Sequence, residues 1–170
     1  MAGNDIMKEI LSHPESHWDW FDLSSDSQIT LQMVLSHPKL PWDWSGLSRN
    51  PNITMHMVLS HPELPWDFRE FSFNPNITLV MVLNNPTQDW DWYLLSANPS
   101  ITMDMVLNNS ELPWDLRGLS RNPNLTLDIV LNNSEREWDW YYLSRHPNIT
   151  RAEMLAHPEL PWFAIDILKK

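Results

Sequence analysis

The chain contains no cysteine. This absence excludes disulfide bridges, cysteine-ligated zinc and a cysteine nucleophile, and in a chain with 11 tryptophans it favours a reducing, cytosol-like compartment. Residues 1–8 lack the basic start and apolar run of a secretory signal, and no apolar stretch approaches the roughly 18 residues of a membrane span. We therefore expect a cytoplasmic protein that does not enter a membrane.

Glycine and basic residues are also scarce. Only three glycines occur, so the sequence offers no glycine-rich loop for phosphate, and we expect no cofactor. Eleven Lys and Arg against 22 Asp and Glu give a formal net charge of −11, which is unfavourable for a surface that follows a nucleic-acid backbone. The composition therefore argues against binding of DNA or RNA.

What the sequence does contain is one unit repeated along its length. The first tryptophan of each copy lies 24 residues from the next, and seven copies (7 × 24 = 168) account for nearly all of the 170 residues. A fixed period of this size predicts stacked supersecondary units. We expect one complete repeat domain over 1–170, with altered end units at 1–17 and 162–170 and a last short helix over 165–170. Its repeats begin near Trp18, Trp42, Trp66, Trp90, Trp114 and Trp138, and Trp162 continues the series.

The first half of each copy predicts a short helix. In the second copy Asp43 is a good N-cap, and Trp42 and Leu47 then have the spacing of a hydrophobic staple. The helix is expected over 44–50 and stops there, because a residue before proline avoids the α region and Asn50 precedes Pro51. The same cap recurs at Asp19, Asp43, Asp67, Asp91, Asp115 and Asp139.

The second half predicts another helix of about two turns. Thr54 is the expected N-cap, Ile53 and Val58 form a second staple, and the helix should cover 55–60 before His61-Pro62 ends it. Helices this short do not form alone in water, so each copy needs neighbours. The equivalent caps are Thr30, Thr54, Thr78, Thr102, Thr126 and Thr150.

These signals together predict an all-α fold, a right-handed α-solenoid of seven 24-residue helix-turn-helix repeats. The expected core is built from ladders of equivalent apolar residues, with the column Met33, Met57, Met81 and Met105 as packing filler. In the second copy the core residues are Trp42, Trp44, Leu47, Ile53, Met57, Val58 and Leu59.

The polar columns repeat with the copies and are therefore interpreted as structural. Copies about 8–10 Å apart are too widely spaced for aspartates, or for histidines, of neighbouring copies to share one metal ion. We expect the aspartates to cap helices and a second column to bond carbonyls at helix ends. That column consists of His13, His37, His61 and His157, with Asn85, Asn109 and Asn133 in the remaining copies. No nucleophile–base pair stands out, so we expect no enzyme and no metal site.

Two asparagine columns surround the Asn-Pro turn. Their side chains are expected to bond their own local backbone, with an amide ladder that holds an extended peptide as the alternative. The first column is Asn50, Asn74, Asn98 and Asn122, followed by His146; the second is Asn52, Asn76, Asn124 and Asn148, with Ser100 in the fourth copy.

The positions that vary between copies carry five of the 11 basic residues and all three tyrosines. Arginine and tyrosine dominate binding hot spots, so these columns predict a partner-binding face. The alternative is a solvated face on which arginines pack against neighbouring tryptophans. The candidate binding residues are Arg49, Arg69, Phe73, Tyr93, Arg117, Arg121, Tyr141, Tyr142 and Arg145, and we refer to them as the Arg–Tyr face.

The Trp-Asp-Trp and Leu-Ser-x-Asn-Pro-Asn-Ile-Thr motifs, followed by a Met-Val-Leu-x-Asn-Pro helix, resemble tandem repeats in uncharacterised proteins of giant DNA viruses of amoebae. The resemblance covers nearly the whole chain and is nearest in residues 41–54. It implies a viral origin, and hence the host cytoplasm or the virion as location, but no activity. We expect a non-enzymatic scaffold for a protein or peptide partner. The alternatives are a self-assembling virion or viral-factory protein, possible as a homo-oligomer, and, more weakly, nucleic-acid binding.

Overall fold

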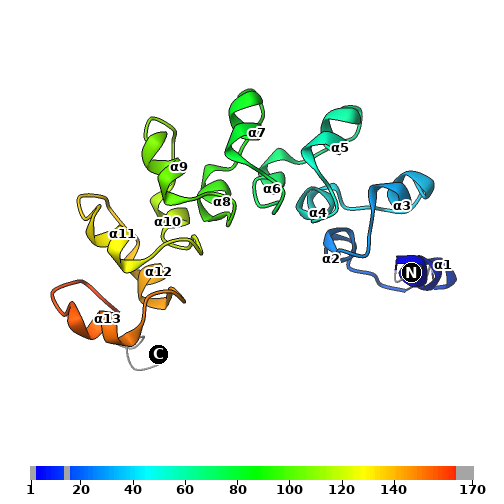
Figure 1. Cartoon of the computed structure of the whole chain (residues 1–170). Coiled ribbons are helices and arrows are strands. Elements are labelled where there is room, and N and C mark those ends of the chain that lie inside the picture. Colours follow the sequence, from blue (N-terminus) through cyan, green and yellow to red (C-terminus); the bar gives the residue numbers. More distant parts are fainter. Residues whose placement is uncertain (1–2, 14–15, 164–170) are drawn as a thin grey trace. The chain divides into compact units, whose positions relative to one another are not determined.

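A computed structural model describes residues 3–13 and 16–163, with side chains from residue 6 onward (Figure 1). Every regular element in these ranges is a helix, which confirms the all-α solenoid of paired short helices. The handedness stays a prediction, and the helix expected over 165–170 lies outside the described residues. The helices are α1 (Gly3–Ser12), α2 (Trp20–Ser25), α3 (Leu31–Ser36), α4 (Trp44–Arg49), α5 (Met55–Ser60), α6 (Phe68–Phe71), α7 (Leu79–Asn84), α8 (Trp92–Ala97), α9 (Met103–Asn108), α10 (Leu116–Leu119), α11 (Leu127–Leu131), α12 (Trp140–Arg145) and α13 (Arg151–Ala156).

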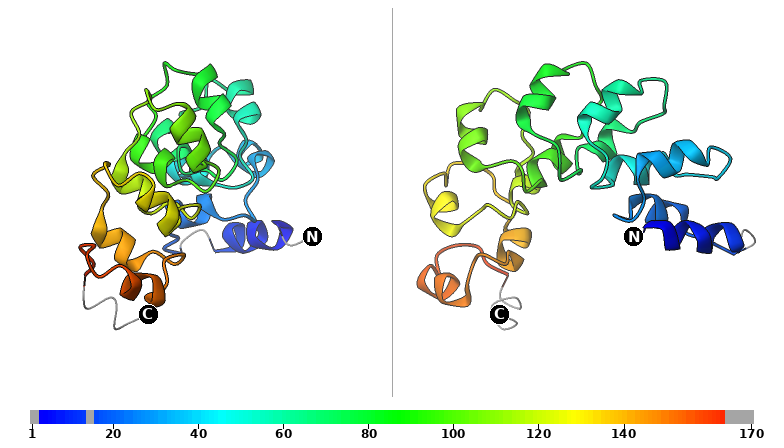
Figure 2. Two further views of the ribbon diagram at one scale, coloured as in Figure 1. Left: turned by 60° about the vertical axis from the view of Figure 1, so that its left-hand side comes forward. Right: turned by 45° about the vertical axis from the view of Figure 1, so that its right-hand side comes forward.

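The chain divides into two compact units, unit 1 over Met1–Trp90 and unit 2 over Asp91–Lys170. The boundary falls inside a copy and does not interrupt the 24-residue period, so a single repeat domain stays a prediction. In unit 1 the first helices α2, α4 and α6 pack side by side, and the second helices α3, α5 and α7 form a row beside them (Figures 1 and 2). In unit 2, α8, α10 and α12 form the first-helix row, and α9, α11 and α13 form the second.

Side-chain caps explain where the helices begin. Each of the six aspartates precedes a first helix and accepts a hydrogen bond from an amide of the first turn, as Asp43 does from Gly46 N–H at 2.8 Å. Five of the six threonines do the same for second helices, and Thr150 forms a capping box with Glu153. Thr126 is the exception: its backbone is extended, as an N-cap requires, but its side chain makes no capping bond. For that position the predicted side-chain cap is wrong.

Both helices of the second copy end immediately before a residue that precedes proline. α4 ends at Arg49, one residue earlier than predicted, and Asn50 adopts φ −61° and ψ 129° before Pro51. α5 covers the predicted residues and ends at His61.

The core is one set of apolar residues per copy. Leu47 and Ile53 are completely buried, and Val58 is 2% exposed. The prediction was wrong for Leu59, which is 52% exposed, and Met57 is only partly covered, whereas Met55 is buried. At about 100° per residue, Met55 and Val58 share the covered face of α5, while Met57 lies about 200° from Met55. Leu59 lies in the last turn, where it is left at the edge of that face.

Aromatic pairs join most copies to the next, with Leu116 replacing the aromatic residue in the fifth copy. The second aromatic residue of one copy meets the first tryptophan of the following copy edge to face, with Trp44 and Trp66 ring centroids 5.1 Å apart. Equivalent pairs lie within each unit, from Trp20–Trp42 to Trp140–Trp162. Because such pairs stabilise by about 0.5–1.5 kcal/mol beyond area burial, they couple neighbouring copies.

Candidate functional site

The first asparagine column is occupied by internal bonds. Asn74 is fully buried, and its Nδ2 donates to the carbonyls of Ser48 (2.9 Å), Asn50 (2.9 Å) and Ile53 (3.2 Å) in the preceding copy. Its Oδ1 accepts the Asn76 N–H at 2.9 Å. Asn50 and Asn122 repeat this pattern. The local bond was predicted, but the three bonds to the preceding copy were not.

The second asparagine column is also used internally. Asn52 Nδ2 donates to the carbonyls of Ser27 (2.6 Å) and Ile29 (2.9 Å), and Asn76, Asn124 and Asn148 make equivalent bonds. The alternative of an amide ladder open to an extended peptide is therefore wrong, because the amides already bond the protein's own backbone.

The serine and aspartate columns form another link between copies. The buried Ser48 Oγ accepts the Asp67 N–H at 3.0 Å, and Ser24, Ser96 and Ser120 bond the next aspartate in the same way. In these four aspartates, Asp43, Asp67, Asp115 and Asp139, the side chain caps its own helix and the backbone amide bonds the preceding copy. Over residues 3–13 and 16–163, no group of three or more His, Asp or Glu side chains is arranged to hold a metal ion.

The histidine and asparagine column partly follows the prediction. His37 Nδ1 lies 3.0 Å from Met33 O, and the three asparagines donate to the equivalent helix carbonyls. His61 and His157 instead bond the carboxylates of Glu63 and Glu159 at 3.1 Å. Sequence reasoning missed a further role of this column: each backbone carbonyl accepts the indole N–H of the tryptophan five residues later.

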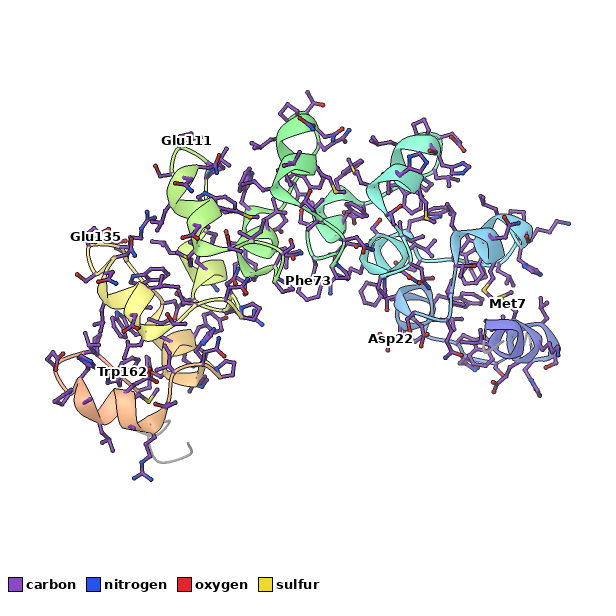
Figure 3. The ribbon with its side chains drawn as sticks, in the orientation of Figure 1. Met7, Asp22, Phe73, Glu111, Glu135 and Trp162 are labelled. Atoms are coloured by element: carbon purple, nitrogen blue, oxygen red, sulfur yellow. The ribbon has the colours of Figure 1, made fainter. Side chains whose placement is uncertain are left out.

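In unit 1, the Arg–Tyr face lies along the first-helix row. Figure 3 shows the neighbouring Asp22 and Phe73 on the side of this row that is turned away from α3, α5 and α7. Arg49 pairs with Glu70, and its guanidinium lies 5.6 Å from the Phe21 ring centroid and 5.1 Å from that of Phe73. Arginine and aromatic side chains of successive copies therefore stack on one another.

The remaining unit 1 arginine of this face is far more open to solvent. Arg69 pairs with Asp89 at 2.7 Å, and the two side chains are 66% and 72% exposed. Such an exposed pair contributes little to stability, so Arg69 can exchange Asp89 for another partner.

Unit 2 carries the longest run of these contacts. The Arg121 guanidinium lies 5.9 Å from the Tyr93 ring centroid and 5.1 Å from that of Tyr142, and it also bonds the Tyr93 hydroxyl. Arg145 lies 3.6 Å from the Tyr141 ring centroid. The rings under these arginines are tyrosine, whereas the packing alternative expected tryptophan.

Arg117 is held beside the same ring system. Its guanidinium lies 5.8 Å from the Tyr93 ring centroid and 3.8 Å from the Asp139 carboxylate, yet its side chain is 67% exposed. A hydrogen bond with Tyr142 raises the pKa of Arg117, so the guanidinium keeps its charge. The structure thus brings together four side chains from three successive copies in unit 2: Tyr93, then Arg117 and Arg121, then Tyr142.

Phe21 and Phe163 also belong to this arrangement and were not among the candidate binding residues. Phe163 lies 5.6 Å from the Tyr141 ring and 5.7 Å from the Arg145 guanidinium.

The acidic partners of Arg49 and Arg69 were not predicted either. They are Glu70 and Asp89, which lie 21 and 20 residues further along the chain. A search for opposite charges a few residues short of the period would have found them.

Comparison with known proteins gave no match to a family model, to a curated protein or to a solved structure. Among the described residues, no helix combines the length and the apolar character needed to cross a membrane.

Proposed function

We propose that the protein is a non-enzymatic repeat scaffold that binds a protein or peptide partner through the Arg–Tyr face. The observation that supports this most is the ladder in unit 2, where exposed Arg117 and Tyr141 belong to a continuous run of arginine–aromatic contacts. The aspartates and threonines cap helices, and the serines and asparagines of the Asn-Pro turns bond neighbouring copies. The Arg–Tyr face, by contrast, varies in sequence and reaches solvent.

Prior ordering of the side chains favours binding. An arginine or tyrosine that is free in solution loses side-chain entropy when it docks, at about 0.5–1.5 kcal/mol for each immobilised side chain. Stacking on a neighbouring ring reduces that loss, and aromatic and guanidinium groups still offer apolar area together with hydrogen bonds. The face has negative charges close by, including Glu70 and Asp139, so we expect a partner surface with both acceptors and donors.

The experiment is crosslinking and capture of partners by a four-site test variant and a three-site control variant, with the captured partners identified by mass spectrometry. Arg69→Ala, Tyr93→Ala, Arg117→Ala and Tyr141→Ala are combined in the test protein. The matched control combines Lys39→Ala, Val80→Ala and Arg151→Ala, which are exposed positions outside the face. A partner kept by the control and lost by the test protein supports the proposal, and equal recovery by both rejects this face.

Self-assembly as a virion or viral-factory component is the second candidate. It is favoured by exposed leucines that recur on the second helices at Leu35, Leu59, Leu83 and Leu107. Light scattering against concentration separates the two, since a strict monomer contradicts assembly. Nucleic-acid binding predicts a steep fall of affinity with salt, and its absence excludes that alternative. The viral origin, and with it a location in host cytoplasm or virion, is part of the same proposal and rests on the motif resemblance.

A further inference from the structure

Unit 1 carries two apolar pockets that are the same site in successive copies. The first has a volume of about 310 Å³ and the second about 350 Å³. Every lining residue of the second lies 24 positions after its counterpart in the first. The first is lined chiefly by Val34, Leu35, Pro38, Leu40, Trp42 and Trp44, and we call it pocket A. The second is lined chiefly by Val58, Leu59, Pro62, Leu64, Trp66 and Phe68, and we call it pocket B.

The two pockets form a row, because Leu64 lines both. A third cavity of about 440 Å³, pocket C, continues the row, since Pro65, Trp66 and Phe68 line both it and pocket B. Pocket C is charged, with Asp67, Asp89 and Arg69 in its wall. The row therefore runs from two apolar sites to one acidic site that now holds an internal arginine.

We propose that this row binds a proline-rich, basic segment of another protein in the polyproline II conformation. Polyproline II segments dock in shallow grooves lined by aromatic residues, and here tryptophan, proline and leucine line both apolar pockets. The spacing agrees. Helices of successive copies pack about 8–10 Å apart, and three residues of polyproline II span about 9.3 Å. Two side chains of the segment that are three residues apart can therefore occupy pockets A and B, which are one copy apart.

The charges around the row fix the position of the basic side chain. Lys39 follows Pro38 beside pocket A, whereas Glu63, 65% exposed, follows Pro62 beside pocket B. At pocket C, the Asp89 side chain is 72% exposed and forms an ion pair with the exposed Arg69. A cation of the ligand can replace Arg69 in this pair, because exposed ion pairs contribute little to stability. The ligand consequently carries its basic residue on the pocket C side of the proline in pocket B, and the peptides tested below place it three residues from that proline.

One polar group is available to orient the ligand backbone. Trp44 lines pocket A, and its indole N–H makes no hydrogen bond within the described residues, unlike that of Trp42, which bonds His37 O at 3.1 Å. Polyproline II leaves its own carbonyls free, so one of them can accept this N–H.

The sequence of unit 2 supplies matched controls. Leu107, 41% exposed, and the partly exposed Leu131 occupy the equivalent positions there, against 40% for Leu35 and 52% for Leu59. Ser110 and Ser134 stand where Pro38 and Pro62 line pockets A and B. This inference does not rest on the Arg–Tyr face, of which only Arg69 borders the row, and the leucine variants below leave that face intact.

The test measures fluorescence anisotropy of two labelled synthetic peptides with the full chain. Their sequences are Pro-Ala-Ala-Pro-Ala-Ala-Arg and Arg-Ala-Ala-Pro-Ala-Ala-Pro, because polyproline II ligands can lie in either direction. We expect one of them to bind saturably and the double variant Leu35→Glu/Leu59→Glu to bind at least about tenfold more weakly. The control Leu107→Glu/Leu131→Glu should bind within about twofold of the unaltered chain. Asp89→Ala should weaken the arginine peptide and leave unchanged a peptide with glutamine in its place.

Several results would overturn the proposal. These are no saturable binding of either peptide below about 1 mM, equal loss in both leucine double variants, or tighter binding of an amphipathic leucine helix than of either proline peptide. If the chain forms concentration-dependent dimers that only the Leu35→Glu/Leu59→Glu substitution abolishes, the row binds a second copy of the chain and not a proline-rich segment. Urea unfolding checks that the variants fold. If Leu35→Glu/Leu59→Glu does not fold, the single variant Leu59→Ser is measured in its place.

Discussion

Replacing Asn74 by alanine is the sharpest perturbation of the links between copies. The side chain is fully buried, donates to three carbonyls of the preceding copy and accepts one amide of its own turn. At about 1 kcal/mol for each hydrogen bond, and with buried carbonyls left unpaired, Asn74→Ala should lower the free energy of unfolding by about 3–4 kcal/mol. That is a large part of the about 5–15 kcal/mol that stabilises a typical domain.

Urea unfolding followed by tryptophan fluorescence and circular dichroism measures this loss. The matched control is Asn108→Ala, an exposed asparagine at the end of α9, which should change the free energy of unfolding by less than about 0.5 kcal/mol. Asn74→Asp is a second variant: its carboxylate faces carbonyl oxygens, so acidification should partly restore stability by protonating it. A loss for Asn74→Ala no larger than that of the control would refute the reasoning.

Three further predictions concern single positions. Gly46→Ala should destabilise unit 1 by about 1–3 kcal/mol in urea unfolding, despite the better helix propensity of alanine, because the new Cβ would lie 2.5 Å from Phe21 O. His146 Nε2 lies 3.0 Å from Asn122 O, whereas Asn122 at the equivalent position donates to three carbonyls of its preceding copy. His146→Asn should therefore raise the free energy of unfolding by about 1 kcal/mol in urea unfolding, and a decrease would contradict this. The pKa of Glu63 is lowered by a hydrogen bond from its own backbone N–H and then by the bond with the His61 imidazole, so an NMR titration should place it below 4.5. The small stabilisation that the ionised Glu63 gives should be present above pH 4.5 and disappear on acidification.

Local features of the structure followed directly from the sequence. Asp43 and Thr54 cap the helices they precede, and Pro51 stops α4, because capping and the restriction before proline act within a few residues. Thr126 shows the limit of this rule, since a capping residue in the right backbone conformation need not make the bond.

Features that depend on neighbouring copies were harder to predict. Met57 and Leu59 looked like core residues, but which side of a two-turn helix is covered depends on how the rows pack. The buried bonds of Asn74 join residues 21–26 positions apart, so no local pattern reveals them. The contacts of Arg121 with Tyr93 and Tyr142 in the candidate site are likewise contacts between copies, whereas Arg145 and Tyr141 belong to one helix. The sequence indicated which columns vary but not that their members stack.

The central claim is that neighbouring copies supply the contacts that a single copy lacks. Far-UV circular dichroism of a synthetic peptide covering residues 41–64, compared with the intact chain in the same buffer, tests it directly. The peptide contains both helices α4 and α5 with their caps, but it lacks the preceding copy's partners for Asn50 and the following copy's Trp66. We predict that the peptide is largely unfolded while the intact chain is helical. A peptide with the helical signal per residue of the intact chain would contradict the claim.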